Sequence, residues 1–303
     1  MSFIEFCMMH GILITHAPRL GVWERYSTES HPRKKNGAVK WMGDHGFVQD
    51  HAVHADVLFW REDKPLKIDP RVITRAVQEA DAERKKLQEN AAMRASMILN
   101  RCVYGRHDYL RRKGFPDEKG LIWCHDKTEH LVVPMYDEMN QLVGMQTIDA
   151  DGNKKFLYGQ RTRGANFVMG RSGPNVLCEG YATGLSIRSA MQSLKNMWRI
   201  HVCFSAHNLA TISSRLTPGL VVADNDSSGT GEAVAKKTGW PYWIAEKTGH
   251  DFNDHHREVG LFAAARSLWA SMYPRGAQDR RNLNTFASSI EARKGAHNFE
   301  PKL

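Results

Sequence analysis

The feature that most constrains the fold is a regular alternation of short apolar runs and amphipathic segments that begins at Asn175. Each apolar run is followed by a segment with helical spacing of apolar residues, the last of which we expect as one helix over 255–272. Repeated βα units of this length predict a parallel sheet covered by helices, with right-handed crossovers. The four apolar runs are NVLCEG, RIHVCFS, GLVVADND and PYWIAEK.

Acidic residues stand at the ends of three of these predicted strands. Glu179 ends the first, Asp224 and Asp226 end the third, and Asp251 and Asp254 follow the fourth. Since the carboxyl ends of parallel strands meet at one sheet edge, we expect these side chains to converge there. An Asp after a strand is often only a helix N-cap, but a set of carboxylates at one edge repels unless a cation lies between them. The pattern therefore predicts a site for Mg²⁺ or Mn²⁺.

Three stretches, EGYATGLSI, VVADNDSSGTGEAVA and GHDFNDHH, resemble the Toprim domain, and more closely the DNA primases of bacteriophages and conjugative plasmids. The resemblance implies that Glu179, Asp224 and Asp226 are catalytic metal ligands, with Asp251 and Asp254 in the acidic motif that follows. Upstream, RHDYLRRKGF and VVPMYDEMNQLVGMQTIDADGNKKFLYG resemble the segment before the primase core and its N-terminal subdomain. The likeness covers residues 105–260 well and the opening residues more loosely.

The resemblance implies synthesis of short RNA primers on a single-stranded DNA template from ribonucleoside triphosphates. Glu179 could also accept the proton of the attacking hydroxyl. Two alternatives stay open: a Toprim nuclease with the same metals, and a non-catalytic replication factor that binds single-stranded DNA. The segments before Glu179 favour a primase, and the intact carboxylates weigh against the non-catalytic factor. The sequence contains no GxxxxGK[ST] motif, so we expect a separate replicative helicase as partner.

Basic residues exceed acidic ones, 42 against 33, which gives a net charge of +9 and makes polyanions expected partners. One basic set precedes the first acidic strand, and the resemblance implies that it binds nucleotide and template: Lys127, Lys154, Lys155, Arg161 and Arg163. A second set consists of candidates for contacts to the DNA backbone: Lys34, Lys35, Arg111, Arg112 and Lys113. The alternative for both sets is a solvated turn or helix face.

Four aromatic residues near the N-terminus have two interpretations. Such side chains stack on unpaired bases in some proteins, but in a small β module they more often form its core. They are Trp23, Trp41, Phe47 and Trp60. Many primases carry a zinc ribbon here, yet the five cysteines form no CxxC pair, so we expect no zinc. We interpret His31, His45, His51 and His54 as surface or packing residues.

The chain is expected to divide into five parts. They are a small β-rich module (1–66), a basic helical connector (67–104), a mixed α+β primase-core subdomain (105–172), a Toprim-type α/β domain (173–272) and a flexible tail (273–303). Asp69 before Pro70 predicts the start of the connector helix. No run approaches about 18 uncharged apolar residues, so no membrane partner is expected. The cysteine usage fits a cytoplasmic protein, in the bacterial host if a phage encodes it.

Overall fold

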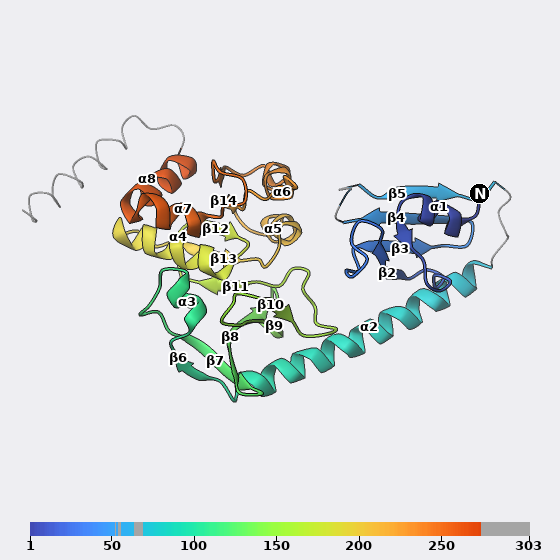
Figure 1. Cartoon of the computed structure of the whole chain (residues 1–303), viewed down its shortest axis with the longest axis horizontal. Helices are drawn as coiled ribbons and strands as arrows, with labels where there is room; N and C mark the ends of the chain where they lie inside the picture. Colours follow the sequence, from blue (N-terminus) through green and yellow to red (C-terminus); the bar gives the residue numbers. More distant parts are fainter. Residues whose placement is uncertain (52, 54–55, 64–68, 274–303) are drawn as a thin grey trace, which may run out of the picture.

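The computed structural model describes residues 1–273, apart from 52, 54–55 and 64–68, so the predicted tail lies outside the described residues except for Tyr273. The described part contains three five-stranded sheets. Figure 1 shows the first sheet in a separate N-terminal module, which a long helix connects to the other two. No helix in the described ranges combines the length and apolarity that a membrane crossing requires.

The N-terminal module is an antiparallel sheet with one helix, α1 (Phe3–Met9), on one face. This helix was not expected from the sequence, although Ser2 and Glu5 form a capping box at its start. Phe3 and Cys7 of α1 pack with Tyr26, Val39 and other buried residues into the core of the module. The strands, in sheet order, are β1 (Ile12–Leu13), β2 (Trp23–Thr28), β3 (Gly37–Trp41), β4 (His45–Asp50) and β5 (Leu58–Arg61).

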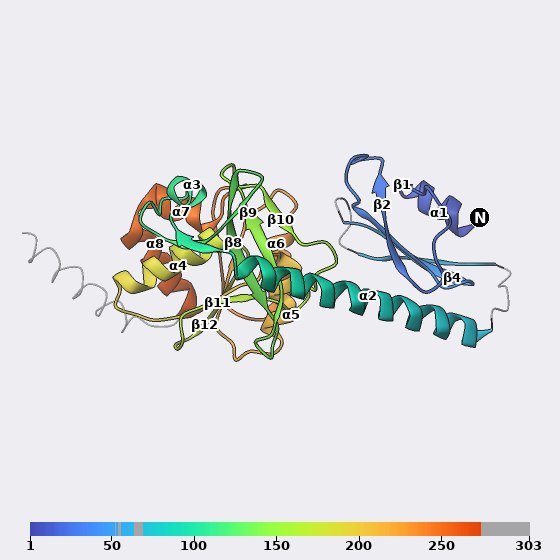
Figure 2. The same cartoon turned by 90° about the horizontal axis from the view of Figure 1, so that it is seen from below.

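Helix α2 (Pro70–Leu99) is the predicted connector, and its start agrees with the sequence. The Asp69 side chain accepts a hydrogen bond from the Arg71 amide, and Pro70 occupies the first turn. Near its C-terminal end the helix buries Ala95 against Val132 and Met145 of the second sheet. Its N-terminal half runs beside the N-terminal module, as Figure 2 shows. The helix thus bridges the module and the rest of the molecule.

The second sheet is antiparallel and carries helix α3 (Asp108–Arg112) between its first two strands. An Asp-Gly turn at 150–153 joins β9 to β10, with Gly152 at a φ of 87°. One face packs on α2, and the other contributes Leu131, Val133 and Ile148 to the main core. The strands are β6 (Val103–Gly105), β7 (Gly120–His125), β8 (Thr128–Tyr136), β9 (Leu142–Ile148) and β10 (Lys154–Phe156).

The third sheet has the order β11-β13-β12-β14-β15, and its last four members in the sequence pair in parallel, as the alternation predicts. Helices α4, α7 and α8 cover one face, while α5 and α6 cover the other. The strands are β11 (Phe167–Met169), β12 (Asn175–Cys178), β13 (Arg199–Val202), β14 (Leu220–Ala223) and β15 (Tyr242–Ile244). The helices are α4 (Tyr181–Ser193), α5 (Ala206–Ser213), α6 (Thr230–Thr238), α7 (Phe252–Val259) and α8 (Leu261–Met272).

Two expectations about this region were wrong. Strand β11, which we placed in the preceding subdomain, pairs antiparallel with β13 and is an edge of the third sheet. The helix predicted over 255–272 is two helices, because Gly260 has a φ of 82° and ends α7 before α8 begins. The βα alternation therefore locates the sheet correctly but misses its antiparallel edge strand and the break between α7 and α8 at Gly260.

Candidate active site

Two acidic residues meet at the carboxyl edge of the third sheet. Strands β12 and β14 are parallel neighbours, and Cys178 pairs with Val222 in their register. Glu179 directly follows β12, and Asp224 directly follows β14. The sheet therefore delivers both carboxylates to the same edge, as the sequence led us to expect. Glu179 lies so close to the backbone of Asp224 that this amide lowers its pKa.

Burial raises the pKa values of this pair of carboxyl groups. It raises the pKa of Glu179 to about 8, with the charges of Asp224 and Asp226 adding to the effect. The pKa of Asp224 rises to about 7, again mainly through burial and then through the charge of Asp251. Glu179 Oε1 and Asp224 Oδ1 are buried and have no hydrogen-bond partner among the described residues. Such groups are costly unless a proton or a cation compensates them.

Asp226 begins the turn that leads into helix α6. Its Oδ1 accepts hydrogen bonds from the Ser228 amide at 2.8 Å and from the Ser228 hydroxyl at 2.5 Å. Gly229 follows in the left-handed conformation with a φ of 67°. Gly231 packs so closely that a Cβ atom there would lie 2.2 Å from the Asp224 carbonyl oxygen. Helix α6 therefore packs directly against the turn that carries Asp224 and Asp226.

Asp251 and Asp254 have a structural role in the fold. They form a reciprocal capping box at the start of α7, in which Asp251 Oδ1 accepts from the Asp254 amide at 2.8 Å. Lys113 Nζ lies 3.9 Å from Asp251 Oδ2 and 3.7 Å from Asp254 Oδ1. The charge of Asp251 is one of the main causes of the raised Asp224 pKa, so Asp251 lies close enough to act on the acidic pair.

Two lysines from the second sheet's subdomain reach this edge. Lys154 of β10 lies beside Gly180, where an added Cβ atom would be 3.8 Å from its Nζ. Its positive charge lowers the pKa of both Glu179 and Asp224, and Lys113 also lowers that of Asp224. Helix α4 begins at Gly180, which provides no side-chain cap for its first amides. The edge therefore combines unsatisfied carboxylates with lysines and the positive end of a helix.

The other predicted basic residues lie elsewhere or are already engaged. Arg161 pairs with Asp137 at 3.5 Å and with Glu138 at 2.9 Å, and Arg111 pairs with Asp108 at 3.0 Å. Lys155 follows Lys154 on β10 and so projects from the opposite face of the strand. The remaining residues are exposed: Lys127 in the β7–β8 turn, Lys34 and Lys35 between β2 and β3, Arg112 at the end of α3, and Arg163 after β10.

Sequence reasoning missed several residues at this edge. Phe204, with a φ of 67°, donates its backbone amide to the Glu179 carbonyl at 3.0 Å and contacts the Phe156 ring at a centroid distance of 6.2 Å. Thr183 is buried in the first turn of α4, and its hydroxyl has no partner among the described residues. Thr183 lies within the EGYATGLSI stretch that carries the resemblance, whereas no local pattern indicates that Phe156 and Phe204 meet.

The aromatic residues named from the sequence lie on two different faces of the N-terminal sheet, and two of the histidines contact neighbouring side chains. Trp60 is buried in the core of the module and Trp41 packs against it, so the core interpretation is confirmed for these two residues. Trp23 and Phe47 lie on the other face, outside that core. His45 pairs with Asp44 at 2.6 Å, His31 contacts Ser30 at 3.1 Å, and His54 lies outside the described residues.

The donors at the edge suit a hard divalent cation chemically, since they are carboxylate oxygens. The two orphaned oxygens of Glu179 and Asp224 are positions that such an ion would satisfy. Within the described ranges, however, no three His, Cys, Asp or Glu side chains are already grouped closely enough to hold a metal ion. The five-carboxylate metal set predicted from the sequence therefore stays a prediction.

Comparisons with known proteins give a partial likeness in fold. No family model matches the chain. One similar chain belongs to a bacteriophage T7 complex of the lagging-strand DNA polymerase with primase domains bound to an RNA/DNA hybrid and dTTP. It has a TM-score of 0.40 and 15% identity, over 57% of this chain and 92% of that chain.

Two other solved structures are similar to a lesser degree. The primase fragment of the bacteriophage T7 primase-helicase protein has a TM-score of 0.37 and 15% identity, over 54% of this chain and 68% of that one. The DnaG primase catalytic domain bound to single-stranded DNA has a TM-score of 0.30 and 14% identity, over 68% and 84%. These values are too low to carry a functional argument, which has to come from the residues at the sheet edge.

Proposed function

We propose that the chain is a DNA primase of the Toprim type, which makes short RNA primers on single-stranded DNA by metal-dependent nucleotidyl transfer. One observation carries the proposal: the buried, unpaired carboxylate oxygens of Glu179 and Asp224 at the ends of neighbouring parallel strands. Mg²⁺ or Mn²⁺ would orient the triphosphate and stabilise the charge that develops on the attacking and leaving oxygens. Glu179, Asp224 and Asp226 are the residues that would hold it.

The surrounding groups fit an anionic substrate. Lys154 lies beside Gly180 at the start of α4, where the first helix amides have no side-chain cap. A triphosphate placed there would meet both a lysine and the positive end of a helix. Lys113, held beside Asp251 and Asp254, provides a second positive charge. The Phe156 ring is exposed and contacts the ring of Phe204, whose backbone bonds to the Glu179 carbonyl, so it offers apolar surface for a base near this edge.

The remaining partners are part of the same proposal. A primase needs a single-stranded DNA template and ribonucleoside triphosphates, and the net charge of +9 suits both. A helicase partner would have to be a separate protein or domain, because the sequence lacks a P-loop motif.

The test is a primer-synthesis assay with single-stranded DNA, labelled ribonucleotides and Mg²⁺ or Mn²⁺. We expect the wild-type protein to make a ladder of short oligonucleotides, and Asp224→Ala and Glu179→Ala to make none. Asp117→Ala is the matched control, because this aspartate is 86% exposed and pairs with Arg106 rather than with a residue of the acidic edge. Melting temperatures of all variants would show that each protein is folded.

The same assay distinguishes the alternatives. Shortened template without new oligonucleotides, lost in Asp224→Ala, would replace the proposal with a nuclease. Template binding with neither synthesis nor cleavage would identify a non-catalytic factor. Synthesis that persists in Asp224→Ala would reject the site itself.

A further inference from the structure

The N-terminal sheet carries a row of three aromatic residues, two of them exposed, on the face away from α1. The registers align Trp23 of β2 with Lys40 of β3, Lys40 with Phe47 of β4, and Phe47 with Phe59 of β5. The rings of Trp23 and Phe47 are 6.3 Å apart, and those of Phe47 and Phe59 are 5.5 Å apart. Trp23 and Phe59 are 48% and 57% exposed. We call Trp23, Phe47 and Phe59, with Lys40 between the first two, the aromatic row.

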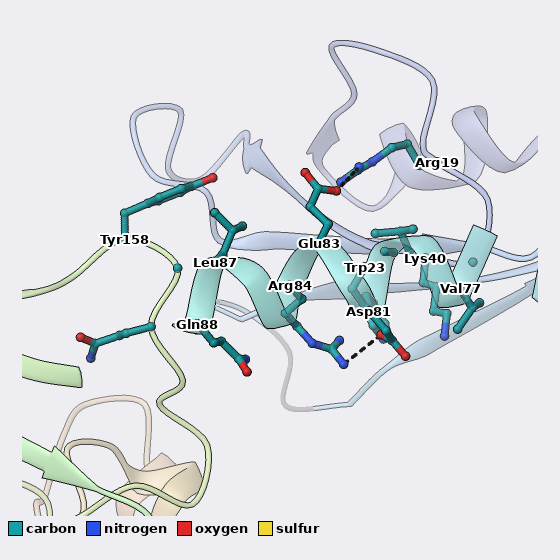
Figure 3. A pocket seen from close by; sticks show the side chains of 15 residues that line it. Arg19, Trp23, Lys40, Val77, Asp81, Glu83, Arg84, Leu87, Gln88 and Tyr158 are labelled. Carbon is teal, nitrogen blue, oxygen red and sulfur yellow. Dashed lines mark hydrogen bonds and ion pairs between the residues drawn. The ribbon is translucent and has the colours of Figure 1, made fainter. Parts of the chain in front are cut away.

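One end of this row opens into a cavity of about 580 Å³ between the module, α2 and the segment 158–160 (Figure 3). Trp23 and Lys40 line it from the sheet, and Tyr158, 77% exposed, lines it from the second sheet's subdomain. The acidic side chains in its wall are already paired, Asp81 with Arg84 and Glu83 with Arg19. The cavity therefore offers two aromatic rings and the positive charge of Lys40.

A second cavity, of about 620 Å³, lies between the N-terminal module and the part of the molecule that carries the second and third sheets. Its walls include Arg25 and His51 from the module, and Arg163 and His207 from the other side. Among the described residues, no Asp or Glu side chain lines it. Ser205, the N-cap of α5, also lines it and makes no capping hydrogen bond with its side chain. Two arginines and two histidines thus face a cavity that, among the described residues, no Asp or Glu side chain lines, which is the chemistry of an anion site.

The two cavities are neighbours along one cleft. Trp23 and Arg25 are two residues apart on β2, so they project from the same face of the sheet. On the opposite wall, residues 158–160 line the first cavity, and Thr162 and Arg163 line the second. The outer sheet face and the segment 158–163 therefore enclose a cleft that is aromatic at one end and cationic at the other.

We propose that this cleft binds a single strand of nucleic acid. Phosphates would lie between Arg25, His51, Arg163 and His207. Unpaired bases would stack on Tyr158 and on the three rings of the aromatic row. Stacking on these rings requires bases that are not already paired, so a single strand fits better than a duplex. The proposal rests on the primase function proposed above and extends it by giving the N-terminal module a base-stacking face that uses no zinc.

The test measures binding of a fluorescent oligothymidylate to the full chain by anisotropy, without divalent cation or nucleotide. We expect Trp23→Ala and Phe59→Ala each to weaken binding about tenfold. Tyr104→Ala is the matched control, since this aromatic residue on β6 is 69% exposed and does not line either cavity. The double variant Arg163→Gln/His207→Gln should reduce the salt dependence, with a slope smaller by about 0.7 for each phosphate that the protein no longer neutralises.

The outcomes separate this proposal from the primase proposal. Binding lost in the cleft variants but unchanged in Asp224→Ala supports the cleft even if no primer synthesis is found. Equal affinity of wild type and cleft variants for the strand would overturn it, and so would tighter binding of duplex than of single strand. If the double variant loses binding of a nucleoside triphosphate but not of the strand, the cleft is a nucleotide site and the proposal is wrong. Melting temperatures check that each variant is folded.

Discussion

The side-chain amide of Asn253 donates a hydrogen bond to the backbone carbonyl of Lys113 at 2.9 Å, which joins α7 to the end of α3 across 140 residues of sequence. The same amide donates to the Ser186 hydroxyl of α4 at 2.9 Å. One buried asparagine thus fixes where Lys113 stands relative to the acidic edge. The lysine lies beside Asp251 and Asp254 because the packing of three helices holds it there.

Lys113→Met should lower primer synthesis by about tenfold while the protein stays folded. Lys113 lowers the pKa of Asp224, so its loss should raise that pKa further and move the acidic limb of the pH–rate profile to higher pH. The measurement is the rate of synthesis as a function of pH. Lys119→Met, an exposed lysine of the same subdomain, is the control and should leave the profile unchanged. An unaltered limb in Lys113→Met would show that its charge does not act on the site.

Two substitutions of Asp251 separate its structural role from its charge. Asp251→Asn should keep the cap of α7, because Asn caps helices as well as Asp does, but it removes the charge that faces Asp224. We expect a nearly unchanged melting temperature and reduced synthesis. Asp251→Ala should in addition lose about 1 kcal/mol of stability. Equal synthesis in wild type and Asp251→Asn would leave this residue only its capping role.

The contribution of Glu179 and Asp224 to the stability of the metal-free protein should fall as pH rises from about 4 to about 8. The folded pKa values of Glu179 and Asp224, about 8 and about 7, lie above the ordinary values of 4.5 and 3.8. In this window the folded chain binds more protons than the unfolded chain, so raising the pH removes stability. The measurement is the melting temperature against pH in the presence of a chelator, for wild type and Glu179→Gln/Asp224→Asn.

The double variant should show a flatter profile and a higher melting temperature at pH 8 than the wild type. Each kcal/mol corresponds to roughly 2–4 °C for a chain of this size range. Adding Mg²⁺ at pH 8 should raise the melting temperature of the wild type and not that of the variant. A profile with the same slope in both proteins would mean that the two carboxylates are not the source of the effect.

The sequence predicts the acidic edge because that edge depends on local order. Glu179 and Asp224 each follow a four-residue apolar strand, and the parallel pairing of β12 with β14 brings the two residues to the same edge of the sheet. In contrast, β11 is a three-residue strand that pairs with a segment about 30 residues away. A run of three residues is too short to show a periodic pattern, so the sequence does not indicate this pairing. Local periodicity therefore finds the parallel strands and misses the edge strand.

Contacts between subdomains were not predictable for a related reason. Lys154 was a candidate from its charge, but its place beside Gly180 depends on how the second sheet packs on the third. Similarly, the separation of Trp23 from Trp41 depends on which residues of β2 and β3 face α1. A shift of one residue in register would exchange the two faces. Composition alone cannot set that register.

Gly231→Ala should reduce synthesis more than the neighbouring substitution Gly229→Ala. A Cβ atom at Gly231 would lie 2.2 Å from the Asp224 carbonyl oxygen, so α6 must move away from the turn that carries Asp224 and Asp226. At Gly229 an added Cβ atom meets nothing within 4 Å, and the cost is only the left-handed backbone, about 1 kcal/mol. Similar synthesis by both variants, measured at equal folded fraction, would show that the position of α6 does not matter to the site.

Asn208→Ala should destabilise the protein by about 2–3 kcal/mol, because it removes the anchor of the segment that carries Arg163. The Asn208 Nδ2 atom, which carries two protons, lies within hydrogen-bond distance of the carbonyls of Thr162, Ala165 and Cys203 at 3.1, 2.7 and 2.8 Å, and its oxygen accepts from the Gly164 amide at 2.7 Å. The substitution leaves several of these buried backbone groups unpaired. The measurement is the free energy of unfolding in urea.

Oligothymidylate binding should also weaken in Asn208→Ala, since Arg163 would no longer be fixed in the cleft. Ser214→Ala is the control: its hydroxyl bonds to the Thr211 carbonyl at the exposed end of α5, and both stability and binding should stay close to wild type. Full stability with weakened binding would place the effect of Asn208 on the cleft alone. Lost stability with unchanged binding would mean that Arg163 does not depend on this anchor.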